Sequence, residues 1–198
     1  MKISKLTATI LLVLSILTSV FVCLIYLSIN KSFSPSADNK SDITKLILLT
    51  QAHTSAENDN LYIDSDKILE YCSRNGLSDS PVFVINYSLL NCKSCIDFVV
   101  KTLKEKLIDL EQRKNILFVA KDFREESKSK YGNSVFLKPG KALDIPADNC
   151  GMPFVFVYYK GQILHTFIPD IANKNVFLSY LDVIFKRYNI IGPESSII

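Results

Sequence analysis

Hydrophobic positions are distributed unevenly along the chain, and they are densest near its start. From Leu6 to Ile29 there is no charged residue in 24 positions. A helix of that length rises about 36 Å, which is enough to cross a hydrocarbon core of about 30 Å. We therefore expect residues 1–29 to be a single transmembrane anchor. A cleaved signal peptide and a lipid-modified Cys23 are the alternatives, and the length of the apolar run favours the anchor.

The next segments are polar and then mixed. Residues 30–42 read NKSFSPSADNKSD, a Ser-rich and Pro-containing stretch that predicts a tether. Residues 43–80 are predicted to be an N-terminal extension of the folded domain. Within it, residues 43–60 carry conflicting strand and helix signals, whereas residues 64–74 have the apolar spacing of a short helix that ends at Asn75-Gly76.

Residues 81–190 alternate between strand and helix patterns and are predicted to form the domain proper. Largely apolar runs rich in β-branched and aromatic residues predict buried strands at 81–87, 115–121 and 153–159. After the turn at Lys160-Gly161, residues 162–168 are predicted to be a fourth strand. Apolar residues at helical spacing predict helices at 95–110 and 173–188. Between these elements we expect a charged loop or short helix at 122–131 and an irregular segment at 132–150.

The connections between the strands predict how they pair. The helix between the first two strands is a crossover, and a crossover of this kind implies parallel pairing. A two-residue turn, as at Lys160-Gly161, can join two strands only as an antiparallel hairpin, so the last two strands are predicted to pair antiparallel. The predicted fold class is therefore α/β, with a mixed β-sheet flanked by helices.

Charge argues against one class of partner and sets the expected topology. The net charge is +3, from 23 basic and 20 acidic residues mixed along the chain. There is no basic block interleaved with aromatic residues, so we expect no nucleic-acid partner. Lys2 and Lys5 keep the N-terminus in the cytoplasm by the positive-inside rule. We expect a single-pass protein of the cell membrane whose domain lies on the extracytoplasmic (periplasmic) side, where disulfides form.

The main chemical signal is Cys92-Lys93-Ser94-Cys95, at the predicted start of a helix. Two thiols at i and i+3 can close a local disulfide and open it again. The first Cys meets unpaired backbone N–H groups and the positive end of the helix dipole, and Lys93 adds a positive charge, so its thiolate is stabilised. As the catalytic pair, Cys92 would attack a partner disulfide and the more buried Cys95 would resolve the mixed disulfide.

Other interpretations of this motif stay open. A CxxC is also half of a zinc site, or an inert structural disulfide. A zinc site needs two more ligands, and Cys72, Cys150, His53 and His165 are scattered singly, so we predict no metal. His165 is expected to be a satisfied or surface histidine rather than a ligand.

Residues 81–188 resemble the thioredoxin superfamily, in particular its membrane-tethered extracytoplasmic members. The matching features are the strand, short loop, CxxC and amphipathic helix, followed later by PFVFVYYKGQILHTFIP with its Lys-Gly turn. The resemblance implies a thioredoxin-like sheet and thiol-disulfide oxidoreductase activity without a cofactor. It also implies protein thiols and disulfides as substrates, and a redox partner that recycles the CxxC pair.

Gly151-Met152-Pro153 is the second matching motif. In the family a cis-proline opens the third strand and faces the redox pair. The resemblance therefore implies a cis Pro153 and a substrate-binding role for Met152 and Pro153. Cys150 should approach the CxxC end of the sheet as a candidate third redox thiol; a small buried hydrophobe or a bridge to Cys72 is the alternative.

The chain also departs from the family's pattern. Asn91 stands where Trp often precedes the first Cys, and Asn86 stands where a buried acid often accepts a proton. Val100 replaces the usual helix proline. The missing acid and Trp are consistent with a non-enzymatic thioredoxin-fold scaffold, which is one alternative. The other is a copper-handling module, since some thioredoxin-fold proteins bind Cu(I) through two cysteines and a histidine.

Overall fold

The computed structural model describes residues 17–22, 37–121, 131–138 and 141–190. By its internal contacts the chain divides into two units, Met1–Leu48 and Leu49–Ile198. The predicted anchor at 1–29 lies outside the described residues except for residues 17–22, which are helical. Across the described ranges, no helix has both the length and the apolar character that a membrane crossing requires. Most of the segment predicted at 122–131 also lies outside the described residues.

Helix α2 (Ala37–Asn58) decides between the conflicting strand and helix signals at residues 43–60. It begins inside the segment that composition predicts as a tether. Residues 37–58 contain no Gly or Pro, so they include neither of the two residue types that most strongly destabilise a helix interior. In the second unit, the Gln51 side chain hydrogen-bonds the backbone of Ile168 twice, donating to its carbonyl at 2.7 Å and accepting from its N–H at 3.1 Å. The end of α2 therefore belongs to the folded domain.

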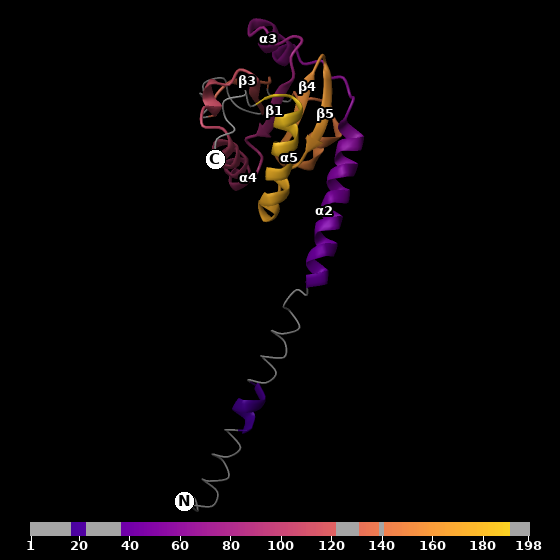
Figure 1. The fold of residues 1–198 in the computed structure, drawn as a ribbon, viewed down its shortest axis with the longest axis vertical. Coiled ribbons are helices and arrows are strands. Elements are labelled where there is room, and N and C mark those ends of the chain that lie inside the picture. The colour runs from indigo at the N-terminus through magenta and orange to yellow at the C-terminus, as the bar shows by residue number, and fades with distance from the viewer. Residues whose placement is uncertain (1–16, 23–36, 122–130, 139–140, 191–198) are drawn as a thin grey trace, which may run out of the picture. The chain divides into compact units, whose positions relative to one another are not determined.

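The second unit is built on a five-stranded sheet in the order β3-β2-β1-β4-β5 (Figure 1). The strands are β1 (Val82–Ser88), β2 (Ile116–Lys121), β3 (Ser134–Phe136), β4 (Phe154–Tyr159) and β5 (Gln162–Phe167). β2 pairs in parallel with both β1 and β3, whereas β4 pairs antiparallel with β1 and β5. The predicted mixed sheet, its parallel crossover and its hairpin are confirmed.

Strand β3 corrects the prediction that residues 132–150 are irregular. It has three residues, all of them half-buried, and it pairs with β2 at one edge of the sheet. A strand this short contains too few residues to show a period of two in the sequence.

Helices cover both faces of the sheet (Figure 1). Helices α4 (Lys93–Lys106) and α5 (Lys174–Arg187) pack on one face, and α3 (Asp66–Arg74) packs on the other. Alternation along β1 explains the two layers, because successive side chains point to opposite faces. Phe83 and Ile85 join the core under α4 and α5, while Val82 and Val84 join the core under α3.

Helix α4 ends four residues before the predicted Leu110. Leu107 leaves the helix with extended dihedral angles (φ −131°, ψ 104°), and Leu110 begins a 3₁₀ turn (Leu110–Gln112). Both leucines stay buried. The apolar spacing therefore continues past the end of the helix, and the sequence pattern alone could not locate that end.

Candidate redox site at the start of helix α4

Cys92 is the N-cap residue of α4, and Cys95 lies one turn inside the helix. The Cys92 carbonyl accepts hydrogen bonds from the N–H groups of Cys95 and Ile96, at 3.0 Å and 3.2 Å. Cys92 is exposed, whereas Cys95 is 7% exposed. The predicted contrast in exposure between the two sulfurs is confirmed. The Cys92 thiol is accessible from solvent, whereas the Cys95 thiol is buried.

The two thiols differ in acidity in the direction that the helix start predicts. Hydrogen bonds from the thiol of Cys95 and the hydroxyl of Ser94 lower the pKa of Cys92 to about 7, assisted by the backbone N–H groups of both residues. The Ser94 Oγ atom is 2.9 Å from Cys92 Sγ. The hydrogen bond to Cys92, together with burial, raises the pKa of Cys95 to about 11. The Lys93 charge, which the sequence offers as a contributor, is not among the causes of the Cys92 shift.

Asn91 connects the CxxC turn to the loop that carries Met152 and Pro153. Its side-chain oxygen accepts from the N–H of Ser88 at 2.7 Å, and its Nδ2 donates to the Gly151 carbonyl at 2.8 Å. Short polar side chains commonly bond to backbone groups in turns. In the sequence, Asn91 is notable only because it stands where Trp is common in the family, and nothing there predicts its bond to Gly151.

Gly151, held by Asn91, lies between two predicted site residues. Cys150 on one side is exposed, and its Sγ lies 3.6 Å from the Met152 carbonyl oxygen. On the other side Met152 is half-buried and Pro153 is buried. The structure therefore brings the chain segments around both predicted motifs together at one end of the sheet.

The Met152–Pro153 peptide bond is trans, which corrects the cis geometry implied by the family resemblance. Gly151 adopts left-handed dihedral angles (φ 67°, ψ 10°) at the end of the 3₁₀ turn Pro146–Cys150. For an X–Pro bond the trans form is the more stable one by about 0.5–1 kcal/mol.

Cys72 lies away from this site in the core under α3. It is 3% exposed, and burial raises the pKa of its thiol. Cys72, Cys92, Cys95 and Cys150 are all free thiols. The bridge between Cys72 and Cys150, left open by the sequence, is therefore not formed in this structure.

An ion pair with little solvent exposure supports the loop that carries Cys150. Asp148 pairs with Lys121, and their side chains are 5% and 12% exposed. The Asp148 carboxylate also accepts from Asn86 Nδ2 at 3.2 Å and from the Leu143 N–H at 2.6 Å. The structure thus places a carboxylate against Asn86, where the sequence shows no acid. Its origin in a distant loop explains why sequence reasoning missed it.

Asp170 brings a second carboxylate to the same end of the sheet. It follows β5, whose Phe167 pairs with Val155 two residues after Pro153. Its side chain accepts from the Ala172 N–H at 2.9 Å. After the Cys92 hydrogen bond and burial, its negative charge is among the causes that raise the pKa of Cys95. The loop after β5 therefore lies within electrostatic range of the buried sulfur.

The histidine at position 165 is satisfied within the fold, as predicted. His165 Nε2 lies 2.9 Å from the Tyr188 hydroxyl and 3.2 Å from an Arg187 nitrogen, and burial lowers its pKa. Within the ranges that the structure describes, no group of three or more His, Cys, Asp or Glu residues is arranged to hold a metal ion.

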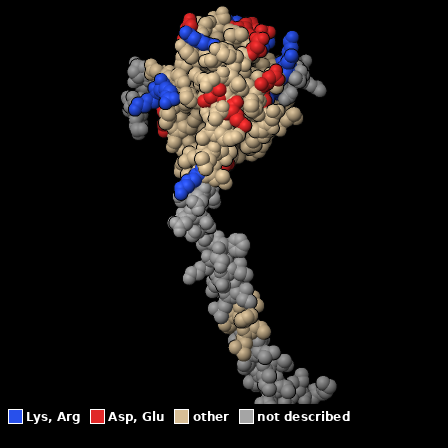
Figure 2. Space-filling model, turned by 90° about the vertical axis from the view of Figure 1, so that its right-hand side faces the viewer, with Lys and Arg blue, Asp and Glu red and all other residues tan. Residues whose placement is uncertain are grey.

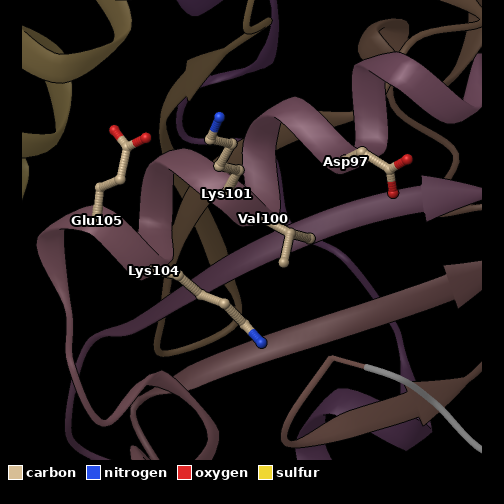
Figure 3. A pocket seen from close by; sticks show the side chains of 5 residues that line it. All are labelled: Asp97, Val100, Lys101, Lys104 and Glu105. Carbon is tan, nitrogen blue, oxygen red and sulfur yellow. The ribbon is translucent and has the colours of Figure 1, made fainter.

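The surface of α4 carries a hollow of about 380 Å³ that contains no thiol (Figure 3). Two of its charged side chains are paired: Lys104 with Glu111 at 3.0 Å, and Glu105 with Lys174 at 2.6 Å. On the face shown in Figure 2, acidic and basic side chains are interspersed among uncharged ones. Neither feature adds a reactive group to the site at Cys92.

Comparisons of the chain with protein-family models, with curated proteins and with solved structures give no match. The site's own geometry is therefore what bears on function.

Proposed function

We propose that this protein is a membrane-anchored thiol-disulfide oxidoreductase of thioredoxin-like fold that acts on extracytoplasmic protein disulfides. The observation that carries the proposal is the pairing of an exposed Cys92, whose pKa is lowered to about 7, with a buried Cys95, whose pKa is raised to about 11. A low pKa supplies the attacking thiolate near neutral pH, and the second thiol stays protonated until it is needed.

The arrangement of elements supports the thioredoxin-like assignment. The CxxC opens a helix that follows β1 and leads to the parallel strand β2, and the β4–β5 hairpin completes the sheet next to β1. Asn91, beside Cys92, donates a hydrogen bond to Gly151, two residues before Pro153, and Pro153 immediately precedes β4. Met152 and Pro153 are thus proposed to offer backbone to a bound substrate.

The proposed reaction is a two-step exchange. The Cys92 thiolate attacks one sulfur of a substrate disulfide, which forms a mixed disulfide and releases the first substrate thiolate. Cys95 then loses its proton to solvent and attacks the Cys92 sulfur, which releases the second substrate thiolate. The substrate gains two electrons, and the protein is left with a Cys92–Cys95 disulfide. A dithiol redox partner restores the reduced pair, and the same steps in reverse would oxidise a substrate dithiol.

The membrane anchor and the extracytoplasmic location are part of this proposal. They rest on the uncharged run Leu6–Ile29 and its basic N-terminal flank. An oxidising compartment is where protein disulfides are common substrates.

Trapping of mixed disulfides tests the proposed activity. Cys95→Ser should accumulate adducts with native partners, because the resolving thiol is missing, whereas Cys92→Ser should accumulate none. Both variants carry Cys150→Ala, so that Cys150 cannot resolve the adduct instead. Non-reducing gels should show adducts that disappear with dithiothreitol. If neither variant forms adducts and the wild-type chain fails to reduce a model disulfide, a scaffold is the better account. Tight Cu(I) binding by such an inactive chain would indicate copper handling.

A further inference from the structure

His165 lies at an irregularity in strand β5. Residues 164–167 of β5 face residues 155–157 of β4, so β5 has one residue more than its partner over this stretch. The backbone of His165 is left-handed, with φ 55°, a conformation that residues other than glycine rarely adopt. A bulge of this kind changes the direction in which a side chain points. Here the ring of His165 meets the end of helix α5.

The contacts of the ring require His165 to be neutral. Its Nε2 atom lies 3.2 Å from Nη1 of Arg187. A guanidinium has no acceptor, so Nε2 accepts this bond and the proton of the ring is on Nδ1. The Tyr188 hydroxyl, 2.9 Å from Nε2, can donate to the same nitrogen. A proton added to Nε2 would therefore face two hydrogen-bond donors, one of them positively charged.

Other titratable groups reach His165 from the segment after α2 and from α5. The Asp59 carboxylate is 3.9 Å from Nδ1 and accepts a hydrogen bond from the Thr166 N–H at 2.9 Å. The Tyr180 hydroxyl donates to the His165 carbonyl at 2.6 Å. Burial lowers the pKa of His165, the Asp59 charge opposes this shift, and the Arg187 charge adds to it.

Arg187 has space to leave His165. It is the last residue of α5, and it is exposed. It also lines a second hollow, of about 390 Å³, whose lining includes Asp79. The Asp79 carboxylate is exposed and lies 3.5 Å from Lys160. An arginine repelled from an imidazolium would thus have a carboxylate within the hollow that it already lines.

We propose that His165 is a pH-sensitive latch: in its neutral form it holds the C-terminal end of α5 against the bulge of β5, and in its protonated form it releases Arg187 toward Asp79. The Asp59 contact is kept, because an imidazolium and a carboxylate attract. Since folding lowers the pKa of this histidine, its contribution to stability is present above the ordinary value of about 6.5 and is lost as pH falls below it. This inference does not depend on the proposed oxidoreductase activity.

An NMR titration of the full chain in lipid nanodiscs tests the latch. The chain has two histidines, and His53→Gln assigns the two ring signals. We expect the His165 ring to titrate with a midpoint below pH 6.5. The backbone amide of Tyr188 should shift with the same midpoint, because the end of α5 moves when the ring gains its proton.

Charge-removing variants identify the groups that set the midpoint. Arg187→Gln should raise it, since a positive charge that disfavours the imidazolium is gone. Lys186→Gln is the matched control; Lys186 is exposed and its charge is not among the causes of the shift, so the midpoint should move less. His165→Asn should abolish the Tyr188 amide shift, and Asn is among the residues that best tolerate a left-handed backbone.

Three results would each overturn the latch. The first is a midpoint for His165 at or above pH 6.5. The second is a Tyr188 amide shift that persists in His165→Asn, and the third is an equal rise of the midpoint in Lys186→Gln and Arg187→Gln. These measurements do not involve disulfide exchange, so their failure would leave the proposed function standing.

Discussion

The side-chain amide of Asn91 donates a hydrogen bond to the carbonyl of Gly151 at 2.8 Å. This bond joins the residue before Cys92 to the loop that carries Cys150, Met152 and Pro153. The two segments are 60 residues apart in the chain. Asn91 stands where the family that the chain resembles often has Trp, and this bond gives Asn91 a structural role of its own.

Asn91→Ala should slow the proposed disulfide exchange by about fivefold, which corresponds to the loss of one neutral hydrogen bond that holds the loop proposed to bind substrate. The measurement is the single-turnover rate with a peptide disulfide. Asn133→Ala is the matched control, since its amide also donates to a backbone carbonyl, that of Arg113, at 2.9 Å. An equal effect of both substitutions on the rate would show that the Asn91–Gly151 bond has no particular role at the site.

The alkylation rate of Cys92 should follow the ionisation of a thiol with a pKa of about 7. Because the pKa is lowered, the thiolate forms earlier as pH rises, so the rate should climb about tenfold per pH unit below that value and level off above it. Cys95 should stay unlabelled until much higher pH. Faster labelling of Cys95 than of Cys92, located by peptide mapping, would reverse the assigned roles.

Two neighbouring substitutions identify the cause of this acidity. Ser94→Ala removes the hydroxyl that lies 2.9 Å from Cys92 Sγ and should move the alkylation midpoint to higher pH. Lys93→Gln is the matched control and should move it less, because the Lys93 charge is not among the causes of the shift. A larger effect of Lys93→Gln would restore the sequence-based explanation.

The sequence predicted the sheet and its helices well, because long apolar runs and helical spacing are local properties. It also predicted the contrast between Cys92 and Cys95, which follows from their positions at a helix start. It could not predict the bond from Asn91 to Gly151 or the pairing of Asp148 with Lys121, since these join segments far apart in the chain. The cis geometry at Pro153 came from family resemblance and not from a pattern in the residues themselves, and the structure has the trans bond there.

Asp148→Ala should lower the free energy of unfolding by about 3 kcal/mol, because it leaves the largely desolvated Lys121 charge without its partner. Adding Lys121→Met should recover most of this loss, since no uncompensated charge then remains. Denaturant unfolding of the reduced protein measures both. Asp182→Ala is the control; it breaks the exposed pair with Lys106 and should cost no more than about 1 kcal/mol. A similar small cost for Asp148→Ala would mean that the pair does not stabilise the loop.

Reporter fusions test the proposed topology. A reporter joined after Asp42 should be active only if it is of a kind that works outside the cytoplasm, because the proposed topology has Lys2 and Lys5 on the cytoplasmic side. Replacing both lysines with Glu should weaken that orientation and is the internal control. Activity of a cytoplasmic reporter at the same junction in the unaltered chain would overturn the topology.

The redox potential of the Cys92–Cys95 couple tests the central claim most directly. The full chain with Cys150→Ala is equilibrated in glutathione buffers of graded ratio, and the fraction of the Cys92–Cys95 disulfide is measured by alkylation and mass spectrometry. We predict a single two-electron transition between about −270 and −120 mV, the range of thiol-disulfide oxidoreductases. A transition below about −300 mV, as in structural disulfides, or the absence of a Cys92–Cys95 disulfide at every ratio, would contradict the account.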